Sequence, residues 1–200
     1  MQPDSRTDAE VIASSWTDVE EFGVIFRRHY ASVFAFVARR VDRNDAADVT
    51  ADVFVKAMTI RHRYDTSYEF ALPWLYRIAY HAIGDRIRRR KRRKDVDLAI
   101  RADRAGARVE VEASDRFVAL DVSDDLLEAL GRLPKGSRDA LLLSALEGLS
   151  YSQIGEVLGV SPLTVGSRLS RARRRIREWI PELEQRTRRK DGPRPEETGD

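Results

Sequence analysis

The sequence of 200 residues contains no cysteine, only three histidines and no long apolar run. The lack of cysteine excludes disulfides, thiolate zinc sites and thiol redox switches on this chain. Because no apolar run approaches the length of a membrane span, we expect no membrane insertion. The amino-terminal segment from Met1 to Trp16 is acidic and lacks the basic-then-apolar order of a secretory signal. These features predict a cytoplasmic protein.

Catalytic motifs are also missing. The histidines His29, His62 and His81 are scattered, without a paired metal-ligand spacing such as His-Glu-x-x-His. No glycine-rich phosphate loop occurs. These absences argue against a metal-dependent nuclease, so we expect no enzyme activity, no catalytic residues, no metal and no cofactor. We interpret His29 as a core or boundary side chain.

Charge is plentiful but segregated. The chain has 36 Lys and Arg against 33 Asp and Glu, a net charge of +3. One basic block covers residues 86–94 and another covers residues 168–177, whereas residues 95–128 are net acidic. Such segregation favours a polyanionic partner that contacts both basic blocks. The alternative is that each block is only the solvated face of a helix.

Apolar spacing predicts a helical first half. Apolar residues recur at steps of three and four over residues 19–41, which is typical of a helix with one buried face. A polar turn at residues 42–45 leads to a second helix that carries Val49, Val53 and Ala57. An aromatic loop follows at residues 61–70. A third helix then begins near Pro73, because proline is tolerated in a first turn.

The chain is therefore predicted to be all-α, with two small helical domains joined by a flexible linker. The predicted parts are a disordered amino-terminal segment (1–17), a helical domain (18–94), a linker (95–120), a helix-turn-helix domain (121–182) and a disordered tail (183–200). A linker of this length could span on the order of 85 Å, or about two and a half turns of duplex. Two domains so tethered could read two separated sites.

The second domain contains two doubly marked helix starts. Ser150 can cap a helix whose Gln153 reaches back to complete a capping box. Gly159 then supplies a sharp turn. Ser161 can cap the next helix, with Pro162 at its first position. A short helix, a glycine turn and a second helix predict a helix-turn-helix, whose second helix enters the major groove of DNA.

The second helix of this motif has two distinct faces. Val165, Leu169, Ala172 and Ile176 form a predicted buried stripe. Arginine can bind guanine or phosphate, and serine or threonine can reach either. The residues predicted to contact DNA are Ser161, Thr164, Ser167, Arg168, Ser170, Arg171 and Arg175. The alternative is an antiparallel helical hairpin with a charged rim.

These motifs resemble a known family. Leu133-Pro134, Gly148-Leu-Ser-Tyr151, Leu158-Gly159 and Arg171-Ala-Arg173 look like region four of the extracytoplasmic-function (ECF) sigma factors. The first half is similar to their region two, through Asp45-Ala-Ala-Asp-Val49, Val53-Phe-Val-Lys-Ala57 and Trp74-Leu-Tyr-Arg-Ile-Ala79. The resemblance implies a sigma factor that directs promoter-specific initiation by RNA polymerase.

The resemblance also implies a division of labour. Region two would bind the beta-prime clamp of core polymerase through Asp48, Asp52 and Phe54. It would read the minus-ten element through the loop and basic helix, with Tyr64, Tyr68, Phe70, Arg77, His81 and Arg88. Aromatic residues on an irregular loop suit an unstacked base, although they could instead pack under the loop. Trp74 is assigned mainly to the core.

Region four would bind the minus-thirty-five element and the beta flap, and an anti-sigma factor is the further expected partner. The chain departs from the family pattern at Ala51, His81, Leu163 and Gly166. We expect its promoter preference to differ from that of its relatives at the last three.

One other function class remains open at this stage. A stand-alone dimeric regulator could carry a similar carboxy-terminal helix-turn-helix. The first half argues against it, because it shows no alternating strands and no phosphoacceptor pocket.

Overall fold

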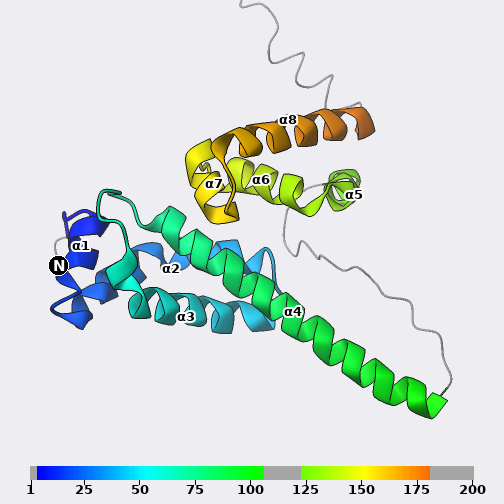
Figure 1. Ribbon diagram of the computed structural model, residues 1–200, viewed down its shortest axis with the longest axis horizontal. Helices are drawn as coiled ribbons and strands as arrows, with labels where there is room; N and C mark the ends of the chain where they lie inside the picture. Colours follow the sequence, from blue (N-terminus) through cyan, green and yellow to red (C-terminus); the bar gives the residue numbers. More distant parts are fainter. Residues whose placement is uncertain (1–3, 106–122, 181–200) are drawn as a thin grey trace, which may run out of the picture.

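The computed structural model describes residues 4–105 and 123–180, and every regular element in these ranges is helical (Figure 1). The first range contains α1 (Asp8–Ser14), η1 (Val19–Glu21), α2 (Phe22–Ala38), α3 (Arg43–Thr59), η2 (Arg61–Arg63) and α4 (Leu72–Ala105). The second range contains α5 (Asp124–Arg132), α6 (Lys135–Leu146), α7 (Tyr151–Leu158) and α8 (Pro162–Trp179). The predicted all-α class is confirmed.

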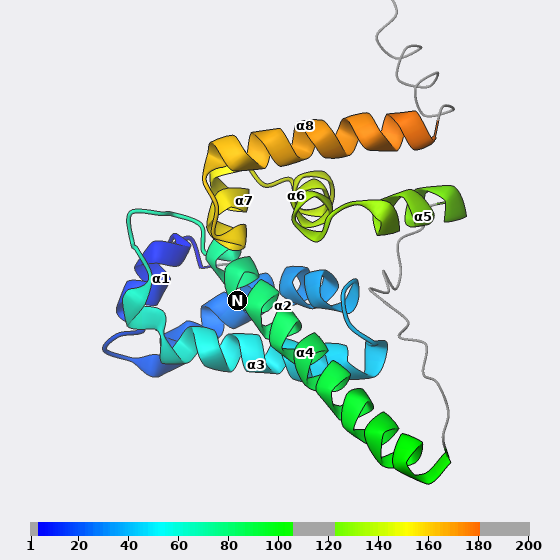
Figure 2. The same ribbon diagram turned by 45° about the vertical axis from the view of Figure 1, so that its right-hand side comes forward.

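The first half has a core formed by α2, α3 and α4, which pack against one another (Figures 1 and 2). Val33 and Phe36 of α2, Val53 of α3 and Leu75 of α4 are fully buried. Complete burial of side chains of this size stabilises a fold by about 1.5 to 3 kcal/mol each. The apolar spacing of the sequence predicted these three helices correctly.

The amino-terminal segment corrects one expectation. Disorder was predicted for residues 1–17, yet α1 forms within them. Thr7 and Glu10 make a reciprocal capping box that satisfies two backbone amides at the start of α1. Val11 and Ile12 are fully buried, because α1 packs on α2. The segment is short, but these two apolar side chains and its cap fix it to the domain.

Helix α4 is longer than expected. It continues to Ala105, which places residues 95–105 of the predicted linker inside a helix. The sequence of this stretch contains Leu, Arg and Ala, which have high helix propensity. The rest of the predicted linker and the predicted tail at 183–200 lie outside the described residues. No helix in the described ranges is long and apolar enough to span a membrane.

The second half forms the predicted helix-turn-helix from α7 and α8. The Ser150–Gln153 capping box begins α7, and Gly159 ends it with the left-handed backbone angle φ of 67°. Few residues other than glycine adopt this angle without strain. Ser161 caps α8, and Val165, Leu169, Ala172 and Ile176 are its buried stripe, as predicted. Both helix starts are therefore confirmed.

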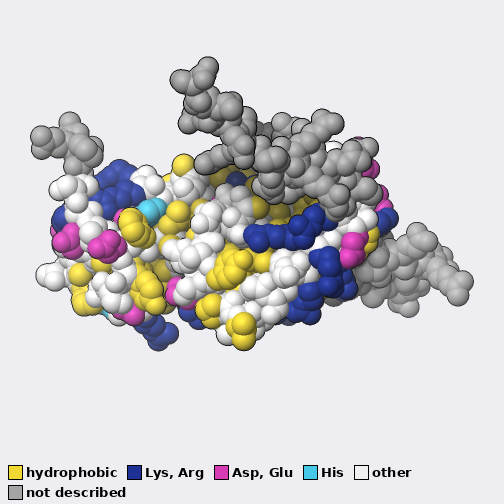
Figure 3. Space-filling view, turned by 90° about the horizontal axis from the view of Figure 1, so that it is seen from above, with side chains coloured by type: hydrophobic (Ala, Val, Ile, Leu, Met, Phe, Trp, Pro, Cys, Tyr) yellow, Lys and Arg dark blue, Asp and Glu magenta, His cyan; other side chains and the backbone are white. Residues whose placement is uncertain are grey.

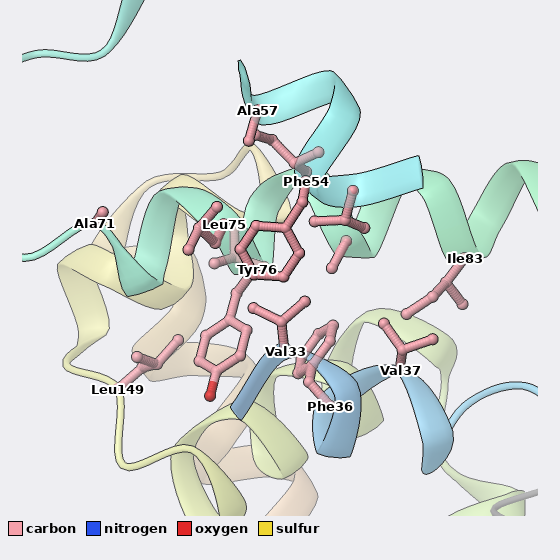
Figure 4. Close-up of a cluster of buried hydrophobic side chains, with 14 of the residues drawn as sticks. Val33, Phe36, Val37, Phe54, Ala57, Ala71, Leu75, Tyr76, Ile83 and Leu149 are labelled. Atoms are coloured by element: carbon pink, nitrogen blue, oxygen red, sulfur yellow. The ribbon is translucent and has the colours of Figure 1, made fainter. Parts of the chain in front are cut away.

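The two halves are not separate in this structure. Helix α7 packs on α4, and Leu149 lies beside Tyr76 in a core that both halves share (Figure 4). The Glu147 carboxylate pairs with Arg39 and Arg40, which follow directly after α2. No spacing within the sequence predicted this contact, because it joins side chains more than a hundred positions apart.

A second polar contact crosses the same boundary. The Tyr80 hydroxyl donates to the Asp139 carboxylate at 2.7 Å, and the Lys135 ammonium pairs with the same oxygen at 2.7 Å. Burial, reinforced by Asp139, raises the pKa of Tyr80. The hydroxyl therefore stays protonated at neutral pH and remains a donor to Asp139.

Candidate nucleic-acid interface

The outer face of α8 carries most of the side chains predicted to contact DNA. Ser161, Ser167, Ser170, Arg171 and Arg175 are all exposed. The Arg171 side chain lies along its own helix, where its Nε donates to the Ser167 carbonyl at 3.2 Å. Figure 3 looks onto this side of the molecule and shows Lys and Arg side chains gathered along α8. The face is therefore polar, basic and accessible.

Two of the predicted residues are less accessible. Thr164 is half-buried, and its hydroxyl lies 2.9 Å from that of Ser161 at the helix cap. Arg168 is half-buried against α6, with its guanidinium 2.9 Å from the position that a Cβ would take at Gly136. Arg168 therefore helps α8 pack on α6, so Arg171 and Arg175 are the better placed arginines for DNA.

The start of α8 presents an apolar side chain to solvent. Leu163 is 83% exposed, more than any other large apolar side chain in the described ranges. It follows Ser161 and Pro162 at the amino end of the helix, which is the end that enters the major groove in this motif. An apolar side chain at this place can contact the methyl group of thymine.

A second accessible face runs along the loop and α4. Tyr68 and Phe70 are 52% and 70% exposed on the loop. Arg77, His81 and Arg88 follow at steps of four and seven, which places them on one side of α4, and all three are exposed. Arg88 pairs with the neighbouring Asp85. Aromatic rings next to a basic helix are suited to single-stranded nucleic acid.

Tyr64 does not belong to this accessible set. It is 6% exposed, its ring packs edge-on against Trp74, and its hydroxyl donates to the Tyr68 carbonyl at 2.6 Å. The predicted role of Tyr64 in base stacking is corrected, because its ring forms the inside of the loop. Trp74 is partly buried and packs against the core, which agrees with its predicted assignment.

Helix α3 carries an acidic surface. Asp48 and Asp52 are exposed, as a role in binding another protein requires. Phe54 is 5% exposed, so its predicted direct contact with polymerase is corrected. Its ring instead lies 4.9 Å from Phe26 and 6.3 Å from Tyr30, measured between centroids. Phe54 therefore packs against the rings of Phe26 and Tyr30 from the buried side.

Sequence reasoning missed the exposed aromatic pair of α2. Phe26 and Tyr30 are 42% and 36% exposed, and Met58 of α3 is 37% exposed. Their three- and four-residue spacing was interpreted as core. An excess of apolar positions on one helix, more than a single buried stripe can hold, is the signal that could have revealed them.

The described residues contain no group of His, Asp and Glu side chains that could hold a metal ion. Their chemistry is that of hydrogen bonding, ion pairing and stacking. A helix-turn-helix with a basic outer face, joined to a second helical domain with an aromatic loop, defines the class of helical DNA-binding proteins.

Comparison with known proteins narrows this class. Residues 25–93 match the family model of sigma-70 region 2, and residues 123–176 match that of sigma-70 region 4. The chain is 35% identical to the RNA polymerase sigma factor CarQ of Myxococcus xanthus, over 82% of this chain and 92% of that protein. It is 31% identical to the ECF RNA polymerase sigma factor SigM of Mycobacterium tuberculosis, over 86% of this chain and 83% of that protein.

A solved structure agrees with these relatives. The structure of CnrH in complex with the cytosolic domain of CnrY is similar with a TM-score of 0.59 and 27% identity, covering 88% of this chain and 97% of that chain. The chain belongs to the extracytoplasmic-function group of sigma-70 RNA polymerase sigma factors. The resemblance seen in the sequence is thereby confirmed, and the stand-alone regulator is not favoured.

Proposed function

We propose that the two accessible faces divide promoter recognition between them and that the surface of α2 and α3 binds core RNA polymerase. The observation that carries this proposal is the presence on one chain of a helix-turn-helix with an exposed basic face and a separate aromatic loop beside a basic helix. A promoter offers both substrates, since it is duplex upstream and melted downstream. The protein would thus act in the cytoplasm, where polymerase and promoter DNA are found.

The upstream element is assigned to α8. Arg171 and Arg175 are exposed and carry the basic charge, while Ser161, Ser167 and Ser170 offer hydroxyls. If Arg171 reads a base edge, Arg171→Ala will weaken binding to the minus-thirty-five element by about 1 to 3 kcal/mol. Arg168→Ala serves as the comparison, because the Arg168 guanidinium packs against α6.

The minus-ten element is assigned to the loop and α4. Tyr68 and Phe70 would stack on unpaired bases, a contact that contributes about 1 to 3 kcal/mol per base. Arg77, His81 and Arg88 would follow the backbone of the same strand. The remaining basic block continues along α4, where Arg89, Arg92 and Arg93 are exposed.

Polymerase binding is assigned to exposed side chains of α2 and α3. They combine the exposed carboxylates Asp48 and Asp52 with the aromatic pair Phe26 and Tyr30. Aromatic side chains with charged side chains around them are typical of protein interfaces. The beta-prime clamp is the partner implied for this surface, and the beta flap is implied for region four.

A further protein partner of the anti-sigma type is included in the proposal. The solved structure of CnrH holds a second protein, the cytosolic domain of CnrY, which supports a binding surface for such a partner.

The proposal is tested by adding the purified protein to core polymerase and selecting genomic fragments on which initiation becomes specific. Asp48→Ala combined with Asp52→Ala is expected to weaken binding to core without changing duplex binding by α8. A dimeric regulator would instead bind a palindromic duplex tightly without polymerase, and this outcome would replace the proposal.

A further inference from the structure

The loop between α3 and α4 is attached at both ends to the amino-terminal segment of the chain. Its last residue before α4, Ala71, is fully buried, and its amide donates to the Asp8 carboxylate at 3.0 Å. Near its start, Arg61 donates from Nε to the Ser15 carbonyl at 3.0 Å. The exposed rings of Tyr68 and Phe70 lie between these two attachments.

Asp8 is the centre of the attachment. It is 5% exposed, and it accepts from Arg28 Nη1 at 2.9 Å and lies 2.7 Å from His29 Nε2, both on α2. The same side chain thus joins three parts of the chain: α1, α2 and the end of the loop. A buried carboxylate is held this way only where its oxygens are satisfied, and here three donors surround them.

Trp16 reinforces the other end of the loop. Its indole Nε1 donates to the Arg61 carbonyl at 3.4 Å, and its ring lies 5.9 Å from that of His62. Arg61 also donates from Nη1 to the Met58 carbonyl at the end of α3. The start of the loop therefore contacts Trp16, and its end is hydrogen-bonded to Asp8.

We propose that the segment 4–18, with Asp8 as its positioning residue, holds the aromatic loop in the shape that receives an unstacked base. This segment precedes residues 25–93, which match the region 2 family model. Asp8 touches no DNA in this account. It acts through the backbone of Ala71, which sets where Phe70 leaves the domain surface, and the inference rests on the proposed reading of melted DNA by this loop.

Preorganisation is the physical reason for such a device. A loop that must be ordered on binding loses affinity for each side chain that becomes immobilised, so a loop already held at both ends binds more tightly. Removal of Asp8 would leave the Ala71 amide and two cationic or polar groups of α2 without their shared acceptor. The loop would then sample other shapes while α8 stayed unchanged.

The experiment compares Asp8→Ala with two matched variants in the full-length protein bound to core polymerase. Glu20→Ala removes an exposed carboxylate from η1 and controls for charge. Val33→Ala truncates a fully buried side chain of α2 and controls for lost stability. The probe is the single-stranded non-template strand of the minus-ten segment, taken from a promoter that the wild-type holoenzyme selects.

Asp8→Ala is expected to weaken binding of this probe about tenfold, which corresponds to about 1.4 kcal/mol, the size of one base stack. Affinity for core and for the upstream duplex should change less than about twofold. Asp8→Asn should fall between, because its amide oxygen can still accept from Ala71. Trp16→Ala should also weaken binding of the probe. The Trp16 side chain is 44% exposed, so it can be removed without opening the core.

Two results would overturn the inference. One is wild-type affinity for the probe in Asp8→Ala. The other is an equal loss in Val33→Ala at the same thermal stability, which would mean that Asp8 only stabilises the fold. Failure of the wild-type holoenzyme to bind the probe at all would instead contradict the proposed function of the loop.

Discussion

Gly155 lies where α7 meets the turn of the helix-turn-helix, and it has no room for a side chain. A Cβ built there would lie 2.6 Å from the Val160 carbonyl oxygen, a distance that real Cβ atoms essentially never show. The Val160 amide donates to the Gly155 carbonyl at 3.0 Å, so the turn backbone is held against the helix. Gly155→Ala must therefore displace the backbone of the turn.

The expected cost follows from two opposing effects. Overpacking at a tight contact costs about 1 to 3 kcal/mol, and the upper part of this range applies because the obstacle is backbone. Alanine in place of glycine regains about 1 kcal/mol of helix propensity. We expect Gly155→Ala to lower the free energy of unfolding by about 1 to 2 kcal/mol, and the displaced turn should also weaken duplex binding by α8.

Gly166→Ala provides the matched control in the neighbouring helix. The nearest atom to a Cβ there is a ring carbon of Tyr151 at 3.6 Å, which is an ordinary contact. This variant should raise the free energy of unfolding by up to about 1 kcal/mol. Urea unfolding followed by circular dichroism measures both. Equal or greater stability of Gly155→Ala would refute the geometric argument for the turn.

Three further predictions rest on other contacts. Hydrogen bonds from His29, Ala71 and Arg28 outweigh the effect of burial and lower the pKa of Asp8 to about 2, so its contribution is present above about pH 4 and lost as pH falls through about 2. The stability difference between wild type and Asp8→Asn, about 2 kcal/mol at neutral pH, should therefore shrink in urea unfolding at pH 3, and a constant difference would contradict this. Burial lowers the pKa of Arg40 to about 10 despite Glu147, and Glu147→Ala should cost about 3 kcal/mol or separate the two halves, seen as an increased radius of gyration in X-ray scattering; Glu128→Ala, at an exposed pair, should change neither. If Leu163 contacts a thymine methyl group, replacing that thymine by uracil should weaken duplex binding by the wild type about fourfold and should not change duplex binding by Leu163→Ala. If no upstream position shows this difference, Leu163 makes no thymine contact.

Local signals in the sequence predicted most helices and both starts of the helix-turn-helix. Capping at Ser150 and Ser161 depends on side chains within three residues, so the sequence alone contains the required information. The buried stripe of α8 follows from its period in the same way.

What the sequence could not predict depends on distant partners. Tyr64, Tyr68 and Phe70 look alike on an irregular loop, and only the packing of Trp74 against Tyr64 separates the buried ring from the exposed ones. The sequence indicated no role for Asp8, because its partners Arg28, His29 and Ala71 come together only in the folded structure. Disorder was predicted for its segment, yet α1 forms there and places Asp8 against α2 and the loop.

Addition of the purified protein to core polymerase on genomic fragments tests the central account most directly. We predict a stable complex with core and specific initiation that requires both an upstream duplex element and a melted minus-ten element. Failure to bind core, or specific initiation that persists after both elements are scrambled, would contradict the account.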